Sequence, residues 1–212
     1  MTGVQTCALP ISIHAIYAGD KRKSRQCVLI LTEGDSAQTT AVAGLSAFTE
    51  EQRKYYGVMP LKGKIINPKD SKIVSIESNK EFAEIKQILG LEQGVDYSKS
   101  IDKLRYGRII LMTDADVDGD HIKGLGFNLF HEFWHSLLQI EGFFCSLLTP
   151  IVKVIHHQTK QTLSFYSTGE LNHWKSENES SIHHWEINYY KGLGTHDSTE
   201  AQQIFRDMKL QK

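Results

Sequence analysis

Short, continuous apolar runs alternate with segments of helical character along the first two thirds of the chain. The apolar runs are typical of buried strands, and they lie at residues 27–31, 57–61 and 108–112. The segments between them predict helices at residues 37–48, 79–89 and 120–139. This alternation indicates an α/β fold, with a mostly parallel sheet and helices on both of its faces. In such sheets the functional side chains gather at the carboxyl ends of the strands.

Beyond Glu141 the pattern changes, and a smaller α+β part begins. The elements it predicts are a hairpin (145–156 and 161–167), a helix (168–176), a strand (185–190) and a last helix (199–208). Asp197 or Ser198 precedes that last helix and is a suitable N-cap. We therefore expect one domain over residues 25–142 and a continuation over 143–212, which ends soon after its last helix as a truncated chain would.

The first residues of the chain fit poorly onto the charged segment that begins at Lys21. Residues 1–12 are weakly apolar and lack a positively charged start, so they make a poor secretory signal. They are either a non-native extension or an ordinary disordered terminus. We expect residues 1–24 to lie outside the fold as such an extension.

The composition excludes several classes of protein. With 40% hydrophobic and 23% charged residues, a chain of 212 residues can bury a substantial core and fold without disulfide bonds or structural metal ions. Three cysteines, far apart and without a CxxC pair, exclude a disulfide framework and a cysteine-rich zinc module, and they indicate a reducing compartment. No apolar run approaches the roughly 20 residues that span a bilayer. The formal charge of −1 excludes a uniformly basic nucleic-acid coat but not a local basic patch.

The sharpest candidate for chemistry is the acidic segment DADVDGD, from Asp114 to Asp120, directly after the 108–112 run. Carboxylates this close repel one another and require a cation or raised pKa values, and oxygen ligands suit a hard ion such as Mg²⁺. A solvated acidic turn is one alternative. A calcium-binding EF-hand loop is another, but it fails because Leu125 occupies the position of the bidentate glutamate and a strand precedes the loop.

A second acidic motif, EGDSA, follows the first apolar run at residues 33–37. Taken alone it is weak, because Asp35 or Ser36 could simply cap the next helix. If its strand lies beside the strand that leads to Asp114, Glu33 joins the aspartates around one cation. Carboxylates that hold Mg²⁺ in this way are suited to phosphoryl transfer on a nucleic-acid backbone.

A rival motif, HEFWH at residues 131–135, matches the zinc-peptidase pattern HExxH. On a helical wheel both histidines lie opposite the apolar stripe of their helix, so a zinc ion would face solvent. No third ligand is evident, and we reject this interpretation.

Five motifs, in the same order, resemble the TOPRIM region of type IIA DNA topoisomerases. They are EGDSA (33–37), PLKGKI (60–65), DADVDGDHIKG (114–124), TPIVK (149–153) and YYKGLGT (189–195). The YYKGLGT motif and the HIKGL stretch at residues 121–125 are more similar to the eukaryotic and large-DNA-virus enzymes, whereas DADVD is closer to the bacterial ones. The resemblance implies a Rossmann-like TOPRIM domain over residues 25–142, followed by an α+β continuation.

The resemblance also implies a function and its residues. The family cleaves, passes and religates double-stranded DNA as an ATP-dependent homodimer with Mg²⁺, which Mn²⁺ or Ca²⁺ can replace in binding. Glu33 would bind metal and act in acid–base catalysis, Asp114 and Asp116 would hold the ions, and Asp118 would be a further ligand. The positions that would contact the DNA backbone are Lys62, Lys64, His121 and Lys191, each of which taken alone would be a solvated surface residue.

Two parts of the family's enzymes find no counterpart in this sequence: the nucleophilic tyrosine and the ATP-binding domain. ATP is therefore expected to serve the full enzyme and not to bind here, and the chain alone is expected to be inactive. Tyr106 follows an arginine as that nucleophile does, but we expect it to pack at the start of the 108–112 strand. The implied location is the nucleus or cytoplasm, including a viral factory, without secretion or a membrane. The alternatives are another TOPRIM enzyme, of primase or nuclease type, and a non-catalytic nucleic-acid-binding module.

Overall fold

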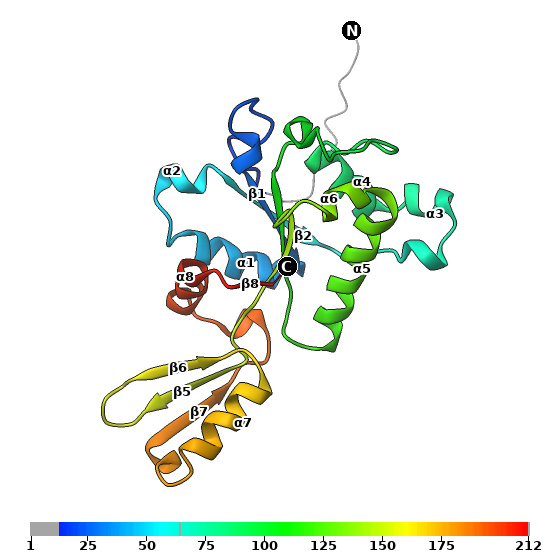
Figure 1. The fold of residues 1–212 in the computed structure, drawn as a ribbon. Helices are drawn as coiled ribbons and strands as arrows, with labels where there is room; N and C mark the ends of the chain where they lie inside the picture. Colours follow the sequence, from blue (N-terminus) through cyan, green and yellow to red (C-terminus); the bar gives the residue numbers. More distant parts are fainter. Residues whose placement is uncertain (1–12, 64, 212) are drawn as a thin grey trace.

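The computed structural model describes residues 13–63 and 65–211, and a five-stranded sheet in the order β2-β1-β3-β4-β8 forms its centre (Figure 1). The strands are β1 (Val28–Glu33), β2 (Tyr56–Leu61), β3 (Arg108–Met112), β4 (Phe144–Leu147) and β8 (Leu210–Gln211). The first four run parallel, and only β8 is antiparallel to its neighbour. The prediction of a mostly parallel sheet is confirmed.

Helices cover both faces of this sheet, as predicted. The helices of the chain are α1 (Gly34–Leu45), α2 (Glu50–Arg53), α3 (Ile73–Glu77), α4 (Lys80–Leu89), α5 (Val117–Phe133), α6 (His135–Leu138), α7 (Thr168–Glu177) and α8 (Ser198–Asp207). Successive side chains of a strand point to opposite faces. Accordingly Val28 and Ile30 pack in one cluster with α1 and α8, whereas Leu29 and Leu31 pack in another with α4, α5 and α6.

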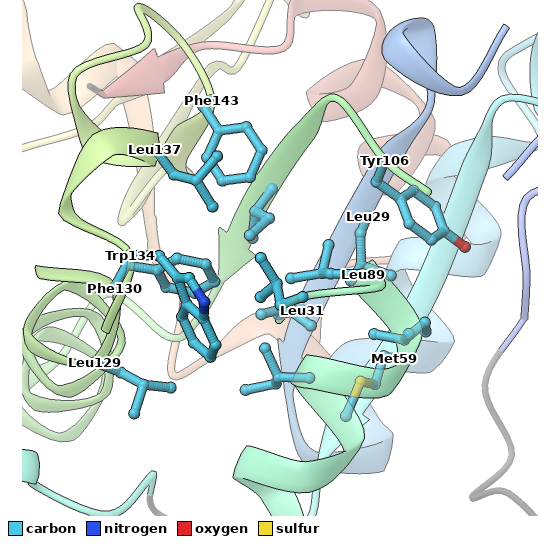
Figure 2. Close-up of a cluster of buried hydrophobic side chains, with 14 of the residues drawn as sticks. Leu29, Leu31, Met59, Leu89, Tyr106, Leu129, Phe130, Trp134, Leu137 and Phe143 are labelled. Carbon is cyan, nitrogen blue, oxygen red and sulfur yellow. The ribbon is translucent and has the colours of Figure 1, made fainter. Parts of the chain in front are cut away.

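Trp134 lies in the larger of these clusters, at the point where the predicted helix over 120–139 is divided into α5 and α6. The expected helix over 120–139 is wrong as a single element, since it begins earlier, at Val117, and breaks at Trp134, whose backbone is not helical (φ −144°, ψ 49°). The indole is buried among Phe130, Leu137 and their neighbours (Figure 2), and its N–H donates to the carbonyl of Glu92 over 2.9 Å. Leaving the helix lets the indole reach that carbonyl within the core.

A second, three-stranded antiparallel sheet carries the α+β continuation. It consists of β5 (Val152–His156), β6 (Thr162–Phe165) and β7 (Trp185–Tyr189) in the order β6-β5-β7, with α7 beside it (Figure 1). The predicted strand over 145–156 is therefore wrong as one element, because its first part is β4 of the main sheet and only its second part pairs with β6. Pro150 lies between the two parts and has no N–H to donate to a ladder.

The segment before β1 also differs from the prediction. Ile13 forms an antiparallel bridge with Val58 of the edge strand β2, and its N–H donates to the carbonyl of Val58 over 2.9 Å. Ala15 is buried and donates its N–H to the hydroxyl of Tyr106, which is itself fully buried. Residues 13–24 are thus packed on the domain, and Tyr106 has the packing role expected of it. Residues 1–12 lie outside the described residues.

No helix in the described part of the chain is both long enough and apolar enough to cross a membrane.

The N-cap of the last helix, α8, is Asp197, one of the two residues predicted for it. The Asp197 carboxylate accepts the N–H of Glu200, and the Glu200 side chain accepts the N–H of Asp197. This reciprocal pair satisfies two backbone donors at the start of α8.

Two helical glycines give a matched test of how α8 packs on α1. A Cβ on Gly44 would lie 2.2 Å from the buried ring of Phe205, whereas a Cβ on Gly124 would meet nothing within 4 Å. We expect Gly44→Ala to lower the free energy of unfolding by about 1–3 kcal/mol, because the ring has no room to move. Gly124→Ala should raise it by about 0.5–1 kcal/mol, because it only removes glycine's entropy. Urea unfolding measures both, and equal effects of the two substitutions would contradict the packing.

Candidate metal centre

Glu33 and Asp114 lie side by side at the carboxyl edge of the main sheet. Their strands, β1 and β3, are parallel neighbours in which Thr32 is paired with Met112, so both chains leave the sheet at the same level. The backbone N–H of Asp114 donates to Glu33 Oε2 over 3.2 Å. The juxtaposition that the two acidic motifs predicted is therefore present.

The surroundings of Glu33 disfavour its ionised form. Burial raises the pKa of its carboxyl group, and the negative charges of Asp114, Asp116 and Asp118 raise it further, against the lowering effect of the Asp114 N–H. A cation bound beside these groups would reverse the repulsion.

The acidic segment turns tightly into α5. Asp116 caps this helix, with its Oδ1 accepting the N–H of Gly119 over 2.8 Å. A Cβ on Gly119 would lie 2.0 Å from the carbonyl oxygen of Asp114, so only glycine fits where the first turn crosses the strand end. Asp118 is exposed in that turn. Gly119 thus allows the first turn of α5 to pack closely against the end of β3, next to Asp114.

The acids do not converge as closely as the sequence suggested. Among the residues that the structure describes, no three His, Cys, Asp or Glu side chains are grouped so that they could hold a metal ion. Glu33 and Asp114 adjoin, whereas the carboxylate of Asp116 is engaged at the start of α5. The donor set still fits Mg²⁺, which is commonly bound through one or two carboxylates while it keeps several water ligands.

A loop from the continuation holds the other side of Asp114. The N–H of Leu193 donates to Asp114 Oδ1 over 2.7 Å. Gly192 has a φ of +150°, and a Cβ on it would lie 2.7 Å from Asp114 Oδ2. The glycine of the Lys191-Gly192-Leu193 motif therefore lets the backbone approach the carboxylate. Sequence reasoning missed this contact, although a glycine beside a motif lysine indicates a close backbone approach.

A cavity of about 190 Å³ lies between the acidic segment and the continuation. Its lining includes Asp114, Asp116, Lys191 and the exposed side chain of Tyr189. Because a lysine and two carboxylates line the same cavity, it offers sites for both a cation and a phosphate oxygen. Of the described residues predicted to contact DNA, Lys191 is the one that lines this cavity with Asp114 and Asp116.

The remaining basic positions are more scattered. Lys62 is exposed directly after β2, whose Leu61 is paired with Glu33, so it lies on the same edge of the sheet. His121 is exposed on α5 and does not line the cavity. Lys64 lies outside the described residues.

The zinc-peptidase motif lies at the surface of the protein. His131, Glu132 and His135 are all exposed, and α5 ends at Phe133 between the two histidines. Their ring centroids are 4.9 Å apart, but no third metal-binding side chain accompanies them within the described residues. The structure supports the rejection of that motif.

The raised pKa of Glu33 leads to a prediction for the metal-free chain. Since the folded pKa lies above the unfolded one, ionised Glu33 costs stability at pH values above the folded pKa, and this cost vanishes as the pH falls below the unfolded pKa. With metal removed by a chelator, Glu33→Gln should therefore have a higher Tm than wild type at pH 7, by about 2 °C, and no advantage in acid. Calorimetry over pH measures this, with exposed Glu132→Gln as the control. A Glu33→Gln chain less stable than wild type at pH 7 would contradict the electrostatics.

Two family models match this chain. Residues 28–142 match the Toprim domain, and residues 147–212 match the C-terminal associated domain of TOPRIM. The DNA topoisomerase 2 of Arabidopsis thaliana is 46% identical over 198 residues, which cover 93% of this chain and 13% of that protein. The DNA topoisomerase 2 of Acanthamoeba polyphaga mimivirus is 45% identical over 204 residues, which cover 94% of this chain and 16% of that protein.

A solved structure agrees with these relatives. The crystal structure of the Plasmodium falciparum topoisomerase II DNA-binding, cleavage and re-ligation domain matches with a TM-score of 0.84 and 43% sequence identity, over 98% of this chain and 26% of that one. The chain thus spans less than a fifth of the length of these curated relatives. With a continuous match over more than half of its residues, the chain belongs to the Toprim domain family, in the branch whose members are DNA topoisomerases of type II.

Proposed function

We propose that this chain is the metal-binding part of a type II DNA topoisomerase, in which Glu33 and Asp114 hold Mg²⁺ at the point where DNA is cleaved and rejoined. The observation that carries the proposal is the juxtaposition of these two carboxyl groups at the ends of neighbouring parallel strands. Asp116 and Asp118, on the same turn, would supply further or water-mediated ligands. Bound Mg²⁺ would neutralise the developing charge on the phosphate oxygens.

Glu33 is the best candidate for proton transfer in this site. A carboxyl group with a raised pKa holds a proton more readily than an ordinary glutamate does, as a group that protonates the leaving 3′ oxygen of the DNA must. The protonation state of Glu33 is set by burial and by the neighbouring aspartates, so metal binding and proton transfer are linked through one side chain. Asp114 in turn would orient the ion, because one of its oxygens is held by the Leu193 N–H.

Lys62, Lys64, His121 and Lys191 are proposed as contacts to the DNA backbone. Support comes from the exposure of Lys62 beside Glu33 at the sheet edge and from the position of Lys191 in the cavity with Asp114. Duplex DNA would be the substrate, and the whole enzyme would be a homodimer that binds ATP through another part. Its action on DNA would be in the nucleus or cytoplasm. The match of residues 147–212 favours a topoisomerase over a primase-like or nuclease-like Toprim protein.

The first test of this function is metal-dependent stability. Mg²⁺ or Mn²⁺ at ten times its Kd should stabilise the folded chain by about 1.4 kcal/mol, which is about 3–6 °C in Tm. Asp114→Ala should abolish this dependence, because it removes a ligand. Asp120→Asn, a change in the same acidic segment at an exposed residue paired with Lys123, should keep it. If wild type and Asp114→Ala respond alike to titrated metal, the site is misassigned.

The second test is the salt dependence of DNA binding. Removing one backbone-contacting lysine should lower the slope of log Kobs against log salt by about one, whatever the DNA sequence. We expect this for Lys62→Ala and Lys191→Ala, measured by fluorescence anisotropy with duplex DNA. Lys103→Ala is the matched control, since Lys103 is exposed just before β3, at the opposite edge of the sheet. Equal slopes for all three variants would exclude the proposed DNA contacts.

A further inference from the structure

The orientation of Asp114 depends on a loop that belongs to a different part of the fold. The Leu193 N–H binds one oxygen of this carboxylate, and the backbone of Gly192 closes against the other. Any displacement of residues 192–193 would therefore move or release the carboxylate. The question is what fixes this loop.

One anchor of the loop is on the main domain. The Leu193 side chain is buried in the cluster between the sheet, α1 and α8, and its carbonyl accepts the hydroxyl of Thr40 over 3.0 Å. These contacts fix Leu193, the residue whose N–H binds Asp114. The residues that precede Leu193 in the loop need a second anchor.

Tyr190 supplies that second anchor. Its N–H donates to the carbonyl of Ile151 over 3.0 Å, and its hydroxyl donates to Glu200 Oε1 over 2.7 Å. Its ring also packs on that of His196, with 4.1 Å between the centroids. Tyr190 and His196 therefore enclose the loop from both of its ends.

Glu200, on α8, joins these groups. Its Oε1 also accepts Lys153 Nζ over 2.6 Å, and its Oε2 accepts the Asp197 N–H over 3.2 Å and lies 3.7 Å from His196 Nδ1. Although burial alone would raise the pKa of Glu200, the bonds from Lys153 and Tyr190 hold it below its ordinary value. Burial and the bond to Glu200 raise the pKa of Tyr190, so its hydroxyl stays a donor. We call Lys153, Tyr190, His196 and Glu200 the Glu200 cluster.

We propose that the Glu200 cluster positions the Asp114 carboxylate for metal binding, with Glu200 and Tyr190 as positioning residues that act through the Leu193 N–H. This inference rests on the proposed metal site and adds residues that are not among the metal ligands and DNA contacts proposed above. Charge-assisted hydrogen bonds are short and directional, so a half-buried carboxylate that accepts several of them is well suited to fix a loop. Supporting contacts of this kind commonly change metal affinity by about 10–100-fold when they are removed.

Tyr190→Phe is the sharpest variant, because it removes one hydroxyl and keeps the ring against His196. In the 212-residue chain, titrated with Mn²⁺ and followed by the electron paramagnetic resonance of the free ion, it should weaken binding about 10-fold. Glu200→Gln should weaken it similarly, and the double variant should be no weaker than the single ones, since both act through one contact. Tyr166→Phe is the matched control, because Tyr166 lines the same cavity as Tyr190 and Glu200. We expect this substitution to leave the Mn²⁺ affinity unchanged.

A metal-free measurement separates positioning from mere stability. The amide of Leu193 should exchange with solvent faster in Tyr190→Phe than in wild type, while amides in β1 and β3 keep their protection. Unchanged Leu193 exchange, or unchanged Mn²⁺ affinity in both cluster variants while Asp114→Asn loses binding, would overturn the positioning role and leave the metal site intact. If Asp114→Asn itself binds Mn²⁺ as wild type does, the metal site fails and the positioning role fails with it.

Discussion

Repulsion between carboxylates at the carboxyl ends of β1 and β3 is the constraint on which the rest of the site depends. Parallel pairing brings Glu33 and Asp114 to one edge of the sheet, and the turn into α5 adds Asp116 and Asp118. The fold relieves this repulsion only in part. Backbone N–H groups bind one oxygen of Glu33 and one of Asp114, and the pKa of Glu33 remains raised by burial and by its neighbours. A bound cation would remove the repulsion that remains, which is the electrostatic reason to propose a metal centre here.

The continuation after β4 holds Asp114, one of the ligands of the proposed metal site. Its own sheet extends away from the main one (Figure 1), and its last helix, α8, packs on α1 to complete one face of the core. Between these elements, the segment from Tyr190 to His196 is held at both ends and closes over Asp114. The two matched families, Toprim and its C-terminal associated domain, therefore meet at one carboxylate. The second of them is a structural part of the proposed metal site, because it supplies the N–H donor of one Asp114 oxygen.

Local patterns predicted most of the fold and the centre of the site. Apolar runs that end at Glu33 and before Asp114 were enough to place both acids at one sheet edge, because parallel strands leave a sheet on the same side. Long-range contacts decided what the patterns could not. Trp134 breaks the predicted helix to reach the carbonyl of Glu92, the 145–156 run is divided between two sheets, and Ile13 pairs with β2 despite an unpromising sequence. The bond from Leu193 to Asp114 joins residues 79 positions apart, and no pattern in either motif contains it.

The central claim, that Glu33 and Asp114 bind a divalent cation, can be tested directly by crystallography. Crystals of this chain soaked in Mn²⁺ and measured near the manganese absorption edge would locate the ion by its anomalous scattering. The account predicts a peak about 2.0–2.3 Å from a carboxylate oxygen of Glu33 and from one of Asp114, with water as most of the remaining ligands. It also predicts that this peak disappears in Asp114→Asn. A peak at His131 and His135 with none at the sheet edge, or none at the sheet edge at saturating Mn²⁺, would contradict it.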